Sequence, residues 1–325
     1  MENKRELLLL IGESGSGKST FARQLVDEQG YVRVNRDDLR IEYSAMGSNL
    51  KGGVTGRDYE NLIAKAEKDA MILALSLGKN VVLDNTHLNE KTVNRWREFA
   101  KQNELNFQIH RMQTPLEICI ERDAQRTGKA HVGRAVIERQ FVKSKRMEFD
   151  PQKPIVLVDL DGTLMDMRGL RGPFEEHRVH LDRCWAKIRN EINRLAQTCT
   201  IVIVSGRHST CGDLSIDSLN GHDVKFAHIL MRHAWDNRAD YIVKEEILNE
   251  LLGVINKDQI LYVIDDRPQV IEKCWLKNNI PVRPVFQGEF IPMGMWTIKH
   301  APDCSFSEGR KGYGRCPQCG ALEDF

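Results

Sequence analysis

The sequence has 325 residues, of which 41% are hydrophobic and 29% are charged, and its formal net charge is +1. This length allows two ordinary domains with separate cores, and the composition is that of a globular protein. A net charge near zero excludes nucleic-acid binding through bulk positive charge, so such a partner requires a local basic surface. No stretch approaches the roughly 20 apolar residues of a membrane span.

The first half of the chain predicts alternating strands and helices. We expect strands at residues 7–11, 31–35, 80–83 and 107–112, and helices at residues 19–29, across 62–77 and from Pro115 onward. The second helix is predicted from the helical spacing of Leu62, Ala66, Ala70, Leu73 and Leu77. Residues 44–58 are rich in Gly, Ser and Asn and predict a loop. A βαβ series of this kind predicts a parallel sheet.

A second series begins at Ile155, after a linker at residues 149–154 that contains two prolines. Its strands are expected at residues 155–158, 200–204, 226–230 and 260–264. Polar or acidic residues follow the clearest strands directly, which is where reactive groups gather in open α/β sheets. We therefore predict an α/β fold with two parallel-sheet domains, at residues 1–150 and 151–297, and a small tail at residues 298–325.

Residues 11–20, IGESGSGKST, satisfy the phosphate-loop pattern between a predicted strand and a predicted helix. The N–H groups of such a loop point at phosphate oxygens, and the helix N-terminus adds a partial positive charge. Lys18 is expected to bridge the outer phosphates and Ser19 to hold Mg²⁺. The alternative, a simple glycine turn, rarely carries the Lys-Ser pair. The predicted nucleotide-binding residues are Gly12, Gly15, Gly17, Lys18, Ser19, Thr20, Arg122 and Arg126.

Charged residues after the next strands complete a predicted kinase site. Asp37 can accept the proton of an attacking hydroxyl, although a helix N-cap is the alternative because a helical run follows. Arg40, one turn on, could fix the phosphate of the acceptor. Arg122 and Arg126 are four apart on a predicted helix, so both would project from one face and neutralise charge on the donor. Two roles are possible for Asp84: an indirect contact with Mg²⁺ or a contact with the substrate.

The segment VDLDGT, from Val158 to Thr163, follows an apolar strand and is similar to the first motif of haloacid-dehalogenase-type phosphotransferases. A carboxylate and a phosphate repel each other, and a bridging Mg²⁺ removes that repulsion. Asp159 would form an aspartyl-phosphate. Asp161 would protonate the leaving oxygen and then activate water. Residues two apart on one strand share a side, which suits this division of roles.

The remaining motifs of such a phosphatase follow in order. Ser205 ends a strand and should hydrogen-bond the phosphoryl oxygens, and Lys244 supplies a compensating positive charge. Asp265 and Asp266 end another strand and complete the predicted Mg²⁺ site with Asp159 and Asp161. The alternative is a set of acidic surface loops, which would not occur in this order at strand ends.

Three segments resemble bacteriophage-type polynucleotide 5′-kinase/3′-phosphatases: NRDDLR at residues 35–40, Arg-x₃-Arg-x-Gly-Lys at 122–129 and RGLRGP at 168–173. The resemblance covers about residues 7–290, with the kinase half first. It departs in the lid, where Thr127-Gly128 stands in place of the family's Gly-Thr. It implies a kinase site of Lys18, Ser19, Asp37, Arg40 and Arg126. The substrate-binding residues expected across both halves are Arg40, Asp84, Arg171, Ser205, Arg207, Arg232, Asp240 and Lys244.

This family implies an enzyme that heals nucleic-acid ends. It would transfer the γ-phosphate of ATP or another NTP to a 5′-hydroxyl and remove a 3′-phosphate, with opening of a 2′,3′-cyclic phosphate as a further candidate reaction. The products would be ready for a ligase, and RNA and DNA both stay open as substrates. The phage relatives imply a homo-oligomer. Since no cleavable signal precedes the glycine loop, we expect the cytoplasm, which is that of the bacterial host for a phage-encoded protein.

Two other functions compete with this one. A small-molecule kinase fused to a metabolite phosphatase would carry the same motifs, because the fold alone does not decide the substrate. A non-enzymatic, zinc-bearing nucleic-acid adaptor would have no use for Lys18, Asp37, Asp159 and Asp161, all of which are intact.

Three of the eight cysteines fall in the last 22 residues. Reduced thiols are expected in an intracellular chain, so metal binding is preferred to disulfides. Four ligands predict a structural zinc site, with a frayed tail as the alternative: His300, Cys304, Cys316 and Cys319. A separate candidate for nucleic-acid contact is the stretch 121–146, where eight Lys/Arg face three Asp/Glu, although a solvated helix face is an equal alternative.

Overall fold

The computed structural model describes residues 4–43, 56–172, 175–234 and 236–291. It divides into two compact units, of which the first ends at His131 and the second begins at Val132. The predicted zinc ligands and most of the predicted loop at 44–58 lie outside the described residues. Within the described ranges, every helix is too short or too polar to cross a membrane.

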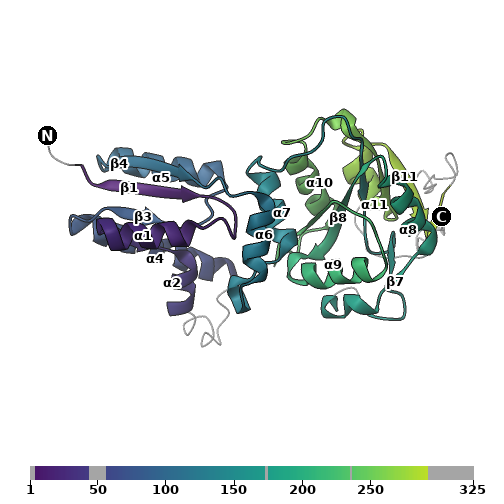
Figure 1. Cartoon of the computed structure of the whole chain (residues 1–325), viewed down its shortest axis with the longest axis horizontal. Coiled ribbons are helices and arrows are strands. Elements are labelled where there is room, and N and C mark those ends of the chain that lie inside the picture. Colours follow the sequence, from purple (N-terminus) through teal and green to yellow (C-terminus); the bar gives the residue numbers. More distant parts are fainter. Residues whose placement is uncertain (1–3, 44–55, 173–174, 235, 292–325) are drawn as a thin grey trace, which may run out of the picture. The chain divides into compact units, whose positions relative to one another are not determined.

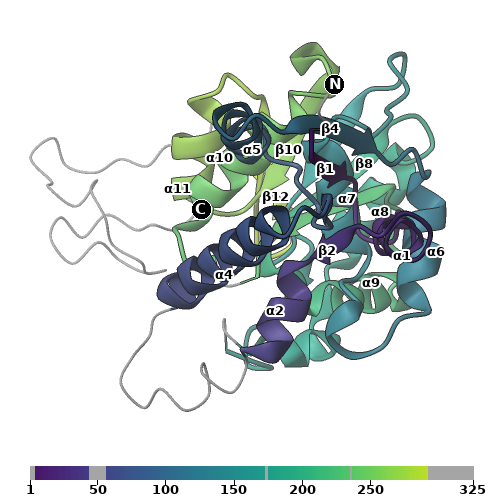
Figure 2. The same cartoon turned by 90° about the vertical axis from the view of Figure 1, so that its left-hand side faces the viewer.

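The first unit is built on a parallel sheet, as predicted. Its strands are β1 (Glu6–Ile11), β2 (Val32–Val34), β3 (Val81–Leu83) and β4 (Asn106–Arg111), in the order β2-β3-β1-β4. Its helices are α1 (Lys18–Gln29), α2 (Arg36–Glu42), α4 (Gly56–Ser76), α5 (Glu90–Gln102), α6 (Leu116–Ala124) and the short 3₁₀ helix η1 (Gly128–Ala130) (Figure 1). Helices α4 and α5 cover one face of the sheet and α1 covers the other (Figure 2).

Helix α4 buries a different face from the predicted one. Leu73 and Leu77, two members of the predicted apolar stripe, are 61% and 70% exposed. Ile63, Glu67 and Met71 are fully buried instead. The buried face contains the carboxylate of Glu67, so a search for apolar residues at helical spacing does not find this face. Glu67 can be buried because Arg36 pairs with it. Helical periodicity alone could not decide which of the two stripes faces the sheet.

The second unit contains a six-stranded sheet in the order β12-β11-β10-β5-β8-β9, which is parallel except for β12. Its strands are β5 (Ile155–Val158), β8 (Thr200–His208), β9 (His228–Arg232), β10 (Ile260–Asp265), β11 (Val282–Phe286) and β12 (Glu289–Phe290), and a separate hairpin is formed by β6 (Met165–Asp166) and β7 (Arg183–Cys184). The four predicted strands are confirmed. The sequence did not predict β11, because its VRPVF segment holds an arginine and a proline.

The helices of this unit are α7 (Arg134–Lys143), η2 (Glu176–Leu181), α8 (Ala186–Leu195), η3 (Ser209–Cys211), α9 (Gly212–Gly221), α10 (Asp240–Leu251), η4 (Lys257–Gln259), α11 (Pro268–Val270) and the π-helix η5 (Ile271–Leu276). The core places α8 and α9 against residues of β5, β8 and β9 that share one face of the sheet. The five cysteines of the described ranges are all free thiols: Cys119, Cys184, Cys199, Cys211 and Cys274.

Helix α7 precedes the predicted linker but packs in the second unit, against β9. Its Arg139 is only 2% exposed and donates to Glu250 at 2.8 Å, to the carbonyl of Met231 at 2.9 Å and to Glu246 at 3.0 Å. The basic stretch 121–146 is therefore divided between the two units. Its most buried arginine, Arg139, contributes to the interior of the second unit.

Substitution of Arg139 by Met should destabilise the second unit by about 3 kcal/mol, because two partly buried glutamates each lose their buried partner and the carbonyl of Met231 loses a donor. Thermal unfolding of the full chain would measure this. The matched control is Arg194→Met, whose exposed pair with Glu191 spans one helical turn and should contribute about 0.5 kcal/mol or less. Equal effects of the two substitutions would contradict the structural role of Arg139.

Candidate active sites in the two units

The predicted phosphate loop connects β1 to α1. Gly15 has a φ of +80°, and a Cβ at this position would lie 2.2 Å from the carbonyl oxygen of Cys119, so only glycine fits. Gly17 caps α1 in the left-handed conformation, and no side chain caps this helix end. The N–H groups of the first turn are therefore oriented for an anionic ligand at a helix N-terminus.

Lys18 lies folded back over the loop. It is 8% exposed, and its Nζ donates to the carbonyl oxygen of Glu13 at 2.7 Å and to Ser16 Oγ at 3.4 Å. Burial lowers the pKa of Lys18 to about 8, although the negative charges of Asp84 and Glu13 oppose the shift. A phosphate would supply the charge that this buried ammonium lacks.

The residues predicted to contact the phosphate acceptor follow the end of β2. Asn35 is the N-cap of α2 and accepts from the backbone N–H groups of Asp37 and Asp38. The alternative that Asp37 is the N-cap is therefore wrong. The Asp37 side chain is 82% exposed and accepts from Arg40 Nη1 at 2.6 Å. Arg40 also pairs with Glu60 of α4 at 2.8 Å, so a carboxylate orients each side of its guanidinium.

Asp84, at the end of β3, is 1% exposed. Its Oδ2 accepts from Arg33 Nε at 2.7 Å, while its buried Oδ1 has no hydrogen-bond partner among the described residues. The negative charge of Asp84 also acts on Lys18, where it opposes the lowering of the lysine pKa by burial. Arg33, which also pairs with Asp38, was not predicted from the sequence. The only sequence feature that could have indicated Arg33 is its position as a charged residue inside the short strand VRV.

Arg122 and Arg126 do not share a helical face, so the prediction that both project from one face of a helix is wrong. Helix α6 ends at Ala124, so Arg126 lies beyond it, because Gln125 already forms the C-cap. Arg122 Nη1 nevertheless lies 3.5 Å from the carbonyl oxygen of Gly15. Arg126 lies 3.4 Å from Asp123, and its charge contributes to the lowered pKa of Lys18. Both arginines thus lie near the phosphate loop, but from different local structures.

In the second unit, three carboxylates meet at the ends of β5 and β10. Asp159, Asp265 and Asp266 place ligand oxygens within 4.8 Å of one another, and all three are buried. Lys244, fully buried on α10, lies 2.7 Å from Asp159 Oδ1, 2.9 Å from Asp265 Oδ2 and 3.4 Å from Asp240. One ammonium therefore faces the charge of several carboxylates.

The pKa values report this excess of negative charge. Burial, reinforced by Asp265 and Asp266 and opposed by Lys244, raises the pKa of Asp159 well above its usual value. Burial and the neighbouring Asp265 raise the pKa of Asp266 to about 7. Although burial alone would lower it, Asp159, Asp240 and Asp265 raise the pKa of Lys244.

An oxygen-only, anionic donor set of this kind fits Mg²⁺, which prefers carboxylate ligands. Asp265 is held by Lys244 and by the backbone N–H of Arg267. Asp266 accepts from Thr163 Oγ1 at 3.0 Å, and a Cβ on Gly162 would lie 2.1 Å from its Oδ2. The glycine of the DGT motif is therefore required by the close approach of Asp266.

Asp161 leaves the same strand end as Asp159 but has a different environment. Arg207 Nη2 lies 2.7 Å from Asp161 Oδ1, and Arg171 Nη2 lies 2.8 Å from the same oxygen. Burial alone would raise the pKa of Asp161, but the two guanidinium groups outweigh burial, and its pKa lies below the usual value. The pKa values of these two neighbouring carboxylates are thus shifted in opposite directions, and each shift runs against the predicted role, because a nucleophile acts ionised and a general acid acts protonated.

Asp182 was not predicted from the sequence. It is 2% exposed and accepts from Arg171 Nε at 2.7 Å, from Arg171 Nη2 at 2.8 Å and from Arg207 Nη2 at 2.7 Å. It therefore orients both arginines that hold Asp161. Asp182 lies in no motif, so its one signal was an acidic residue in an arginine-rich segment.

Three further predicted residues lie around this centre. Ser205 is buried, and its Oγ accepts from the backbone N–H of Arg207 at 3.2 Å. Arg232 donates to the carbonyl oxygens of Gly206, Asp236 and Arg238 and to Asp240 at 3.2 Å. Asp240 also pairs with Lys244 and Arg267. Arg232 and Asp240 thus face protein groups, and their contact with a substrate stays a prediction.

Two family models match the chain. Residues 7–148 match the AAA domain, and residues 153–290 match the phosphatase domain of polynucleotide kinase PNKP. The chain joins a P-loop domain to a PNKP-type phosphatase domain. This confirms the predicted resemblance to bifunctional polynucleotide kinase/phosphatases.

Relatives of the P-loop and PNKP-type domains extend the comparison. A candidate bifunctional polynucleotide kinase/RNA ligase of Autographa californica nuclear polyhedrosis virus is 29% identical over 299 residues, covering 86% of this chain and 42% of the viral protein. A bifunctional polynucleotide phosphatase/kinase of Schizosaccharomyces pombe is 28% identical over 115 residues, covering 35% of this chain and 23% of the yeast protein. The chain thus spans less than half the length of these relatives.

Among solved structures, a chain of the Pnkp1/Rnl/Hen1 RNA repair complex aligns with 88% of this chain and 97% of its own length. The sequence identity is 25% and the TM-score is 0.39.

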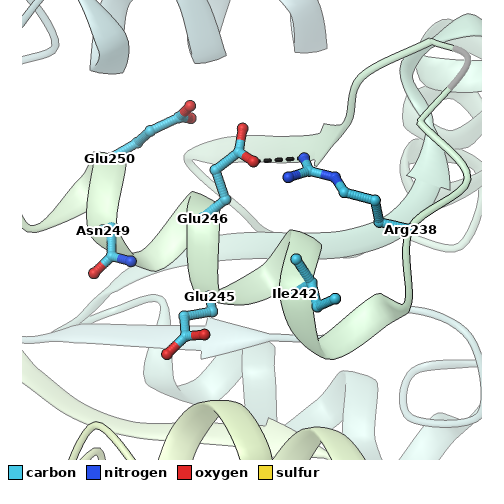
Figure 3. A pocket seen from close by; sticks show the side chains of 6 residues that line it. All are labelled: Arg238, Ile242, Glu245, Glu246, Asn249 and Glu250. Carbon is cyan, nitrogen blue, oxygen red and sulfur yellow. Dashed lines mark hydrogen bonds and ion pairs between the residues drawn. The ribbon is translucent and has the colours of Figure 1, made fainter.

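A pocket of about 390 Å³ lies on the outer face of α10 (Figure 3), and none of its lining residues belongs to the predicted sites. Beside it, His233, Glu246 and Glu250 place ligand atoms within 4.8 Å of one another. Arg139 and Arg238 already pair with these glutamates, which argues against a metal there. The lining residues are Arg238, Ile242, Glu245, Glu246, Asn249 and Glu250.

ATP binding should take up a proton in alkaline solution. Lys18 is charged below its pKa of about 8 and neutral above it, and a bound triphosphate favours the charged form. At about pH 9 we expect uptake of up to about one proton, and little uptake by Lys18 at pH 7. Calorimetry in buffers of different ionisation enthalpy measures this, with Lys18→Arg as the control that keeps its charge. The same uptake in Lys18→Arg would assign the proton to another group.

Asp182→Asn should lower the phosphatase kcat by at least about tenfold, because two buried guanidinium groups lose a charged partner. Kinase activity of the same preparation should persist. Asp166→Asn is the control, since Asp166 pairs with the exposed Arg168. An unchanged phosphatase rate in Asp182→Asn would show that Arg171 and Arg207 hold their positions without it.

Proposed function

We propose that this chain heals nucleic-acid ends, by phosphorylating 5′-hydroxyl groups and removing phosphate from 3′ ends. The observation that carries the proposal is the pairing, in one chain, of a phosphate loop around a buried lysine with a PNKP-type phosphatase domain around a lysine-paired carboxylate. Neither site by itself selects a nucleic acid as substrate. The two together produce the termini that a ligase joins.

In the kinase reaction, the amides of the phosphate loop and Lys18 hold the β- and γ-phosphates of ATP or another NTP. Asp37 accepts the proton of the 5′-hydroxyl while the hydroxyl oxygen bonds to the γ-phosphorus. The bond between the γ-phosphorus and the oxygen that bridges it to the β-phosphate breaks in the same step. Support comes from the exposed carboxylate of Asp37 and its contact with Arg40, which is oriented from its other side by Glu60. Arg122 and Arg126 neutralise charge that develops on the transferred group.

In the phosphatase reaction, Asp159 attacks the 3′-phosphorus and forms an aspartyl-phosphate as the O3′ bond breaks. Asp161 gives a proton to the departing O3′, and then takes one from the water that hydrolyses the intermediate. Inorganic phosphate leaves and Asp159 is regenerated. Lys244 holds Asp159 Oδ1 in place for the attack, and Ser205 binds a phosphoryl oxygen.

Asp161 must gain a proton to act as an acid, yet its two arginines favour the ionised form. The arriving phosphate group carries negative charge and competes for Arg171 and Arg207. Loss of these contacts lets the pKa of Asp161 rise, so its protonation follows substrate binding. Substrate contact by Arg171 and Arg207 then serves both binding and acid catalysis.

Asp159 and Asp266 are the residues we propose to hold Mg²⁺, because Asp265 is engaged by Lys244 and a backbone N–H. When bound, the ion would remove the repulsion between carboxylate and phosphate. Ser19 would hold the second Mg²⁺ with the nucleotide.

Other parts of the proposal rest on sequence or on relatives. His300, Cys304, Cys316 and Cys319 would form a structural zinc site, from their spacing. The names of the viral relative and of the RNA repair complex associate such domains with ligation, which supports RNA ends and a partnering RNA ligase. DNA ends, a homo-oligomer and the opening of 2′,3′-cyclic phosphate are further parts to test.

The decisive experiment separates the two activities. RNA and DNA oligomers with 5′-hydroxyl and 3′-phosphate ends are given to the wild type, Asp37→Asn and Asp159→Asn. We expect Asp37→Asn to lose 5′-phosphorylation by at least about a hundredfold and to keep the phosphatase, with the reverse for Asp159→Asn. Sugars and mononucleotides serve as competing substrates. Faster turnover of these than of oligomer ends would replace the proposal by a metabolite kinase and phosphatase.

A further inference from the structure

One tryptophan contacts the carboxylate cluster of the phosphatase unit. Trp275 is fully buried, and its Nε1–H donates to Asp265 Oδ2 at 2.9 Å. Asp265 is also fully buried, and the same oxygen accepts from Lys244 Nζ at 2.9 Å. The indole N–H and the ammonium thus converge on a single oxygen atom.

A further contact involves the other oxygen of Asp265. Its Oδ1 accepts from the backbone N–H of Arg267 at 2.9 Å, so donors hold both oxygens. The neighbouring Asp266 is held differently, by the hydroxyl of Thr163. The two adjacent aspartates at this strand end therefore have different partners. Asp265 contacts Lys244 and Trp275, whereas Asp266 contacts Thr163.

The local fold explains how the indole reaches this oxygen. Trp275 lies in the π-helix η5, from Ile271 to Leu276, which directly follows α11. π-Helices are rare, occur mostly as single turns and are frequent at functional sites. In a π-helix the residues fall at different angles from those of an α-helix, so this turn decides which side chain faces Asp265.

We propose that Trp275 is a positioning residue of the phosphatase, which acts through Asp265. Its N–H keeps the carboxylate of Asp265 in contact with Lys244. Lys244 in turn holds the nucleophile Asp159, with 2.7 Å between Nζ and Oδ1. Without this N–H, Asp265 turns away from Lys244 and competes with Asp266 for the cation. The proposal rests on the proposed phosphatase function, but the hydrogen bond can be tested without turnover.

The chain offers matched controls. Of the three tryptophans whose side chains are described, Trp96 and Trp185 have a buried Nε1 without a hydrogen-bond partner among the described residues. Trp185→Phe therefore makes the same chemical change in the same unit, with no hydrogen bond to lose. Trp96→Phe makes it in the other unit.

The first test is spectroscopic. Indole ¹⁵N–¹H spectra of the protein labelled at tryptophan should show the Trp275 N–H downfield of those of Trp96 and Trp185, with assignments from the three Phe variants. Asp265→Asn should move the Trp275 resonance upfield and leave that of Trp185 unchanged. Titration with Mg²⁺ in the absence of substrate should also shift the Trp275 resonance. A Trp275 resonance that ignores Asp265→Asn overturns the proposal, whatever the activity of the enzyme.

The second test is kinetic. Trp275→Phe should lower the phosphatase kcat on a 3′-phosphate oligomer on the order of tenfold, which is the expected effect of losing one hydrogen bond to a buried carboxylate. Its kinase rate should match the wild type, and Trp185→Phe should keep both rates. A Trp275→Phe phosphatase no slower than Trp185→Phe overturns the proposal. A wild type without phosphatase activity would instead reject the proposed function, and the spectra would still report on the hydrogen bond.

Discussion

The second unit is organised by the crowding of buried carboxylates around one buried ammonium. Ligand oxygens of Asp159, Asp265 and Asp266 lie within 4.8 Å of one another, and Lys244 supplies positive charge from within the protein. Burying an unpaired charge is costly, so this arrangement persists only because raised pKa values and dense hydrogen bonding relieve it. The same excess of negative charge is what makes the centre attract a divalent cation.

The first unit has the opposite imbalance at its own strand ends. Lys18 is buried with too little negative charge around it, and its pKa is lowered in consequence. Backbone N–H groups at the start of α1 add to this positive character. Each unit thus holds its reactive groups in a state that a ligand of opposite charge completes. This preorganisation follows from placing charges at the carboxyl ends of parallel strands, where side chains from several strands converge.

Buried arginines provide much of the remaining architecture in the second unit. Arg139 connects α7 to α10 and β9, while Arg171 and Arg207 share Asp182 beneath Asp161. A guanidinium group has a planar set of donors that matches carboxylates in fixed geometry. Buried pairs of this kind contribute little net stability but strongly penalise the loss of either partner. They therefore specify one arrangement of the site among many compact alternatives.

The sequence alone determined the two parallel-sheet domains and most reactive residues, because Lys18 and Asp159 belong to motifs whose chemistry depends on local spacing. Tertiary structure decided which groups surround them. Asp182, Arg33 and Trp275 lie in no motif, and each acts on a residue that the fold brings close from another segment. The inward face of α4 and the end of α6 before Arg126 were likewise set by packing and local termination. Local patterns encode backbone periodicity, whereas contacts across the fold depend on three-dimensional proximity that periodicity does not contain.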